Sequence, residues 1–93
     1  MATFIAVHRS PGMSTDEIAA NAPLVAECED ATFRHLYVNL LAGFIVTIYE
    51  GEDQAAVESE FERIGFPWDE IHEVQFETDL DGVKRLQAQG SAG

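Results

Sequence analysis

Residues 32–50 read TFRHLYVNLLAGFIVTIYE, which is two alternating runs separated by a short turn. In each run β-branched and aromatic side chains recur at every second position. This is the spacing of a strand, because successive side chains leave a pleated strand on opposite faces. Gly43 ends the turn and, having no side chain, is available for a positive φ. The stretch therefore predicts a β-hairpin around which the rest of the chain is arranged.

Both faces of this hairpin carry apolar side chains. We expect the face without helices to hold Phe33, His35 and Tyr37, joined across the turn by Ile45 and Tyr49. A sheet face that borders water normally shows polar residues. We therefore expect a second copy of the chain to cover this face. The protein would then be a homodimer with a ligand pocket lined by Phe33, His35, Tyr37 and Tyr49.

The segments outside the hairpin complete a recognisable order. Strands are predicted over residues 3–8 and 71–76. One helix begins after the capping residue Ser14, and the other is capped by Asp53 and stopped by Gly65. The order strand, helix, strand, strand, helix, strand is that of the split βαβ fold. We predict an α+β, ferredoxin-like βαββαβ sandwich with a four-stranded antiparallel sheet, two helices on one face, and pairing of the dimeric α+β barrel type.

Length and composition bound the organisation of the chain. Its 93 residues, 46% of them hydrophobic, support one modest core and exclude a disordered chain. We expect residues 1–77 to form the ferredoxin-like domain. Residues 78–93 are expected to be a C-terminal extension, a short helix followed by a disordered tail.

Charge and cysteine content indicate the partners and the compartment. The 17 acidic residues against 5 Lys and Arg give a formal charge of -12, which disfavours nucleic acid and anionic membranes and attracts cations. No apolar run approaches the roughly 20 residues that cross a bilayer. Residues 1–13 lack the pattern of a signal peptide. With Cys28 as the single cysteine, we expect a cytoplasmic protein.

Three segments carry a resemblance to a known family. They read FRHLYV at 33–38, YEGED at 49–53 with AV at 56–57, and GFPWDEI at 65–71 with Val74. Together they resemble a family of small bacterial ferredoxin-like proteins, long catalogued as a domain of unknown function, that has a nickel-binding branch. The resemblance implies a ferredoxin-like dimer.

Individual positions both follow this family and depart from it. The resemblance covers most of residues 4–76, and His35 and Tyr37 match its His-x-Tyr positions. Thr47 stands where many members have a cysteine, so this sequence lacks one soft metal ligand. The hairpin tip at 40–42 is Leu-Leu-Ala where the family usually has polar turn residues.

Histidines point most directly to chemistry. His8, His35 and His72 fall on three different predicted strands, and Cys28 follows the first helix. Imidazoles suit nickel, zinc and copper, and a thiolate or nearby carboxylates would complete a ligand set. The leading prediction is therefore a divalent metal site, for nickel or zinc, built from His8, His35, His72 and Cys28.

Two other functions stay open. His35 beside Tyr37 in an apolar pocket would suit proton transfer on a small hydrophobic molecule, as in cofactor-free isomerases and oxygenases of the dimeric α+β barrel type. The third reading is a protein-interaction module. Ligands gathered within bonding distance would favour the metal, whereas an apolar cavity lined by His35 and Tyr37 would favour catalysis.

Overall fold

The elements follow one another in the predicted order. The computed structural model describes residues 1–92, with side chains described for residues 1–89. The elements are β1 (Ala2–Arg9), α1 (Thr15–Glu27), β2 (Thr32–Asn39), β3 (Phe44–Gly51), α2 (Gln54–Ile64), β4 (Glu70–Val74) and α3 (Leu80–Ala92).

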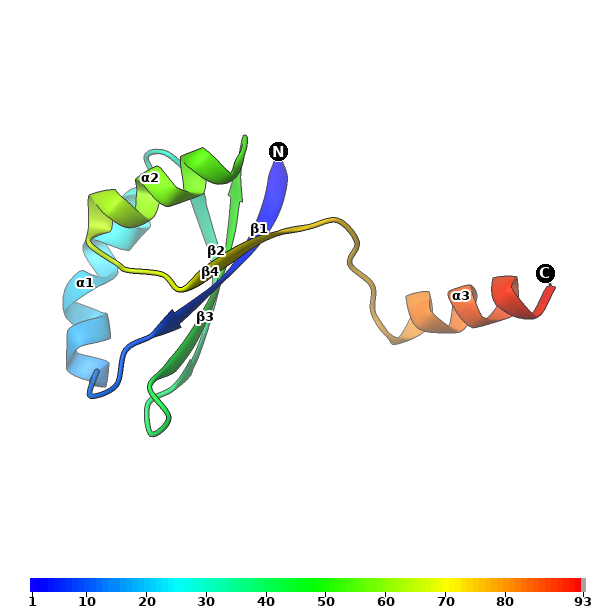
Figure 1. Cartoon of the computed structure of the whole chain (residues 1–93), viewed down its shortest axis with the longest axis horizontal. Coiled ribbons are helices and arrows are strands. Elements are labelled where there is room, and N and C mark those ends of the chain that lie inside the picture. Colours follow the sequence, from blue (N-terminus) through cyan, green and yellow to red (C-terminus); the bar gives the residue numbers. More distant parts are fainter. Residues whose placement is uncertain (93) are drawn as a thin grey trace.

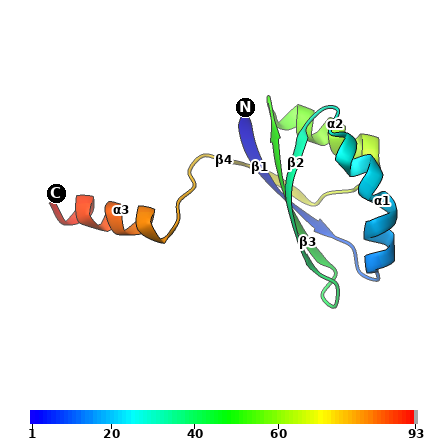
Figure 2. The same ribbon diagram turned by 180° about the vertical axis from the view of Figure 1, so that it is seen from behind.

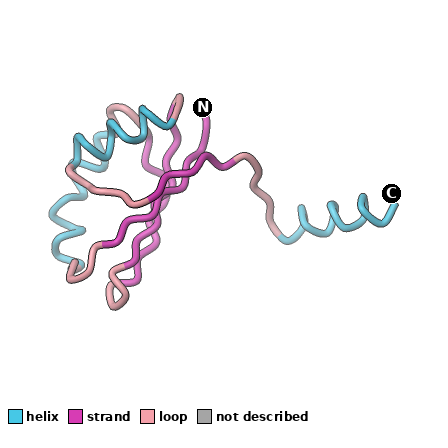
Figure 3. The backbone as a smooth tube through the Cα atoms, in the orientation of Figure 1, coloured by secondary structure: helices cyan, strands magenta, loops and turns pink. Residues whose placement is uncertain are grey.

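The four strands form one antiparallel sheet in the order β2-β3-β1-β4. Opposite views show α1 and α2 together on one side of this sheet, whereas α3 projects away from the sheet on the opposite side (Figures 1 and 2). The tube view shows the same two layers, with the helices in cyan and the strands in magenta (Figure 3). The predicted ferredoxin-like architecture is confirmed for the single chain.

Both helices begin at the predicted capping residues, and α2 also ends at the predicted one. The Ser14 hydroxyl accepts a hydrogen bond from the Glu17 amide at 3.2 Å, and the Asp53 carboxylate accepts one from the Ala56 amide at 2.9 Å. Gly65 ends α2 at φ 70°. These bonds satisfy amides that have no partner inside a helix, so local sequence places both helices.

The core lies between the sheet and the two helices. We call the sheet face toward α1 and α2 the helix face and the opposite one the open face. Phe4, Tyr49 and Phe61 are almost fully buried at the helix face, and Tyr49 meets Phe61 edge to face with centroids 5.0 Å apart. On β1, Ile5 and Val7 alternate with these buried positions and lie on the open face, where they are half-buried.

A β-bulge corrects the predicted faces of the hairpin. Phe33 pairs with Tyr49, but His35 pairs with Ile48, so the register shifts between Phe33 and His35. Phe33 therefore shares the helix face with Tyr49 and the fully buried Ile45. The expectation that these three would lie beside His35 on the uncovered face is wrong, because the extra residue reverses the alternation at that point.

The C-terminal helix is longer than predicted. α3 runs over Leu80–Ala92, where we expected a brief helix and then a disordered tail; residue 93 lies outside the described residues. Good helix formers such as Lys84, Arg85 and Gln87 extend it. α3 projects away from the sheet, and its Leu80 and Val83 side chains are 68% and 50% exposed (Figure 1). Among the described residues, no helix is long and apolar enough to cross a membrane.

Candidate functional site

His8 lies inside the core, on the helix face of β1. Its Nδ1 is 2.8 Å from the Pro67 carbonyl oxygen and its Nε2 is 2.9 Å from the Thr47 hydroxyl. Burial lowers the pKa of the imidazole, although the Pro67 hydrogen bond and Asp69 act in the opposite direction. Both ring nitrogens are occupied, so His8 is a structural residue here and is separated from the other histidines by the sheet.

The other two histidines lie on the open face, at opposite edges of the sheet. His35 on β2 pairs with Ile48, Ile48 with Ile5, and Ile5 with His72 on β4, so the four residues form one row across the sheet. Three strand spacings of about 4.8 Å place the two histidine backbones about 14 Å apart. A metal ion bound by one of them is therefore out of reach of the other in the same chain.

Each edge histidine has a side-chain neighbour on the open face. His72 Nε2 lies 3.1 Å from a carboxylate oxygen of Glu70, and both side chains are more than half exposed. The rings of His35 and Tyr37 are stacked with centroids 6.1 Å apart. The pair of His72 and Glu70 is thus the place on the open face where two potential metal ligands already meet.

Cys28, the fourth predicted ligand, belongs to neither edge. It caps the C-terminal end of α1 in the left-handed conformation, at φ 50°, and its thiol lies 3.4 Å from the Val25 carbonyl oxygen. Within the part of the chain that the structure describes, no group of three or more His, Cys, Asp or Glu side chains could hold a metal ion. The predicted convergence of His8, His35, His72 and Cys28 does not occur in one chain.

An apolar cavity of about 410 Å³ lies at the helix face, under α1. It includes Phe33 and Tyr49 of the predicted ligand pocket but neither His35 nor Tyr37, which the bulge places on the open face. A cavity lined by His35 and Tyr37 would have favoured catalysis, but neither residue lines this cavity. The sequence does not predict the cavity. The spacing of apolar residues predicts a helix, but not how closely that helix packs against the sheet.

A chain of hydrogen bonds borders this cavity. Thr47 lines it and bonds to His8, which in turn bonds to the Pro67 carbonyl. The sequence singles out His8 and Thr47 separately, one as a metal ligand and the other as a departure from a family pattern. Only the sheet brings them together, since they are 39 positions apart in the chain.

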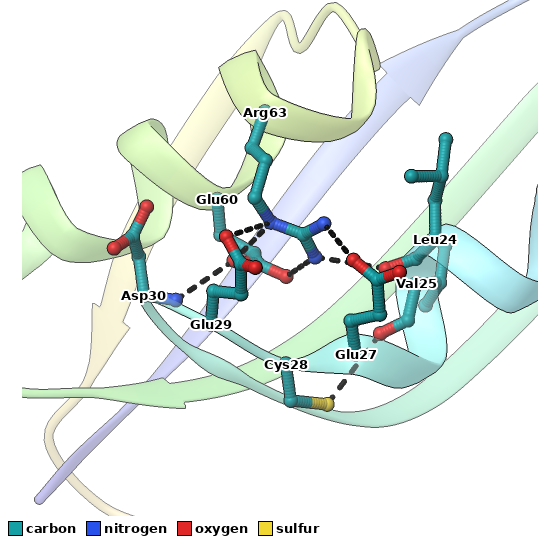
Figure 4. A network of polar contacts seen from close by, with 8 residues as sticks. All are labelled: Leu24, Val25, Glu27, Cys28, Glu29, Asp30, Glu60 and Arg63. Atoms are coloured by element: carbon teal, nitrogen blue, oxygen red, sulfur yellow. Dashed lines mark hydrogen bonds and ion pairs between the residues drawn. The ribbon is translucent and has the colours of Figure 1, made fainter.

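Arg63 attaches α1 to α2 through a network of polar contacts (Figure 4). Its guanidinium donates to the Leu24 carbonyl at 2.8 Å and to Glu27 at 2.9 Å, and it also pairs with Glu60 and Glu29. Burial alone would raise the pKa of Glu60. Its hydrogen bonds from Arg63 and from the Asp30 and Ala31 amides outweigh burial and hold that pKa below its usual value.

Comparison with known proteins gives a consistent result. The profile of a family described as "Nickel responsive protein SCO4226-like" matches residues 4–74. The crystal structure of SCO4226 from Streptomyces coelicolor A3(2) is similar, with 30% identity and a TM-score of 0.73, over 83% of this chain and 100% of that chain. No curated protein matches the sequence. The family match ends before α3.

Proposed function

The chain belongs to the family of SCO4226-like nickel responsive proteins, and from this premise we propose that it binds a divalent metal ion, nickel, at a site completed by two copies of the chain. The observation that carries the proposal is the row from His35 to His72 across the open face. Its two ends carry imidazoles, a ligand type that suits nickel, and its centre, Ile48 and Ile5, is apolar. The cytoplasmic location predicted from the sequence is part of the same proposal.

The row has the form of a self-complementary surface. Val46 and Val7 form a second apolar pair beside Ile48 and Ile5, so the middle two strands present apolar groups to a partner. A two-fold axis parallel to the strands, between β3 and β1, would place His35 of one subunit over His72 of its partner. Packed sheets lie about 10 Å apart, a gap that two imidazoles pointing toward each other can bridge.

The residues at such a site suit the proposed ion. One chain alone does not bring these ligands together, since of the three only Glu70 and His72 are close to each other. Across two chains, His35 joins them, and two imidazoles with one carboxylate form a ligand set that nickel accepts. The dimer would carry two equivalent sites, one at each edge of the paired sheets.

Nickel titration of untagged, chelator-stripped protein tests the proposal. We expect one ion per chain and a melting temperature that rises with nickel, because the ion binds the folded dimer only. His35→Ala and His72→Ala should each weaken binding at least tenfold and remove most of the thermal shift. Glu70→Gln should weaken it less. Glu73→Gln is the matched control, since Glu73 lies on the same strand but the opposite face.

Mixing two defective variants distinguishes a shared site from a site within one chain. The His35→Ala homodimer and the His72→Ala homodimer each lack a ligand at both sites. A heterodimer of the two variants regains one complete site, with His72 from one subunit and His35 from the other. Recovery of half the wild-type nickel stoichiometry is expected in the isolated heterodimer, and of about a quarter in an equimolar mixture whose subunits exchange at random. Unaltered nickel affinity in both single variants would refute the proposal.

A further inference from the structure

The cavity under α1 lies on the other side of the sheet from the proposed nickel site. α1 contributes no buried residue to the core, so the helix covers the sheet without filling the space beneath it. The cavity measures about 410 Å³, and its lining includes no charged side chain. Its apolar walls come largely from Met13, Ile18, Val25, Phe33, Tyr49 and Phe66.

A space of this kind is suited to an organic molecule. Apolar cavities hold water poorly, because water there lacks hydrogen-bond partners. The lining of an empty cavity also loses the dispersion contacts that a filled one would make. The volume falls within the range of roughly 300–1,000 Å³ that is usual for small-molecule sites. The absence of a charged side chain from the lining disfavours an ionic ligand, which would lose its hydration without a partner.

The hydrogen bonds beside the cavity define which group of a ligand can bond to Thr47. The Pro67 carbonyl can only accept, so His8 carries its proton on Nδ1. In the neutral imidazole, which burial favours, Nε2 is then an acceptor and the Thr47 hydroxyl must donate to it. The Thr47 oxygen therefore has lone pairs but no further proton to give. A ligand that bonds to it must be a donor.

We propose that this cavity binds a neutral, largely apolar molecule of about two fused rings whose single hydroxyl group donates a hydrogen bond to Thr47 Oγ1. His8 is a positioning residue in this site: it orients the Thr47 hydroxyl and does not touch the ligand. Thr47 selects a ligand that carries a hydrogen-bond donor, and the volume under α1 limits the size of that ligand.

Calorimetric titration with 2-naphthol and 2-methoxynaphthalene tests the donor requirement. The two probes have similar shape, but only 2-naphthol can donate. We expect 2-naphthol to bind about tenfold more tightly to the wild-type protein. Thr47→Val, which replaces the hydroxyl with a methyl group, should remove this preference, and Thr47→Ser should keep it. Equal affinity of the two probes for the wild-type protein would overturn the proposal.

A filled cavity gives the second test. Ala22 lines the cavity, whereas Ala19, also exposed on α1, does not. Ala22→Trp should abolish 2-naphthol binding, and Ala19→Trp should leave it unchanged. Both variants should bind nickel as the wild-type protein does, so the outcome is independent of the proposed metal site. No saturable binding of 2-naphthol to the wild-type protein, or equal binding to both tryptophan variants, would refute the cavity site.

Discussion

The imidazole of His8 lies parallel to the ring of Phe66, with centroids 3.8 Å apart and planes 5° from parallel. This imidazole and the ring of Phe61 also form a T-shaped pair, with centroids 4.8 Å apart. Between two aromatic rings and a carbonyl, a charged imidazolium would lose its hydration. This is the physical reason why the pKa of His8 falls below its ordinary value.

The stability of the protein should therefore decrease on mild acidification. Because the pKa of His8 is lower in the folded state than in the unfolded state, the unfolded chain binds more protons below about pH 6.5. The contribution of His8 is fully present above that pH and is lost as the pH falls toward its folded-state pKa. We expect a slope of up to about 1.4 kcal/mol per pH unit in the free energy of unfolding. Urea unfolding between pH 7 and pH 5 measures it.

A variant without a titratable group at this position is the control. His8→Gln should be less stable at pH 7, because buried hydrogen bonds are disturbed, and the difference from the wild-type protein should shrink as the pH falls. If the two proteins lose stability in parallel between pH 7 and pH 5, His8 does not cause the pH dependence.

The turn between β2 and β3 should not tolerate a side chain at Gly43. Gly43 has φ 64°, and an added Cβ would lie 2.6 Å from the Pro11 Cα. Gly12, in the adjacent turn, has φ 85° but nothing within 4 Å of such an atom. Gly12→Ala thus isolates the cost of the backbone conformation, about 1 kcal/mol, and Gly43→Ala should cost at least about twice that amount. Thermal unfolding of the two variants compares them, and equal losses would contradict the collision.

Removing Arg63 should loosen α1. Arg63→Met would leave the buried Glu60 carboxylate without its cation and free the Leu24 carbonyl, so we expect a clear loss of stability. In this variant, hydrogen exchange of the backbone amides should also accelerate more in α1 than in α2. Arg34→Met is the matched control: Arg34 pairs with Glu50 at the surface, where an ion pair contributes little. Faster exchange of α1 in the control as well would argue against a specific role of Arg63.

The open face should form the dimer interface. Ile48 is half-buried at the centre of that face, and Ile48→Asp should convert a dimer into a monomer in sedimentation experiments, because a carboxylate cannot be buried there unpaired. Leu41, fully exposed at the hairpin tip, is the control, and Leu41→Asp should leave the dimer intact. The opposite pattern would move the interface to the tip, and a monomeric wild-type protein would refute the dimer.

Much of the fold can be predicted from the sequence because the signals for its helices and strands are local. Period-two alternation identifies the central strands. Ser14 and Asp53 each accept a hydrogen bond from the backbone amide three residues later, and Gly65 ends α2 in the left-handed conformation. Regular alternation also puts His8 on the same face as Phe4 and Ala6, since β1 is regular from end to end. The element order, and with it the ferredoxin-like class, follows from such signals.

The residues of the candidate sites could be selected from the sequence but not grouped. One extra residue at the bulge sends Phe33 to the helix face and leaves His35 on the open face, although the chain reads as one continuous alternation. A bulge depends on how β2 pairs with β3, so the residue pattern of β2 alone does not predict it. For this reason the predicted pocket divides into a cavity under α1 and an exposed edge.

The sequence by itself determined the elements, their order and the chemical types at hand, because capping and alternation act between near neighbours. Only the tertiary structure decided that His8 bonds to Thr47 inside the core and that His35 and His72 stand at opposite edges of one row. Strand register and the fit of a helix against a sheet arise between segments far apart in the chain. They are therefore fixed only when those segments pack together.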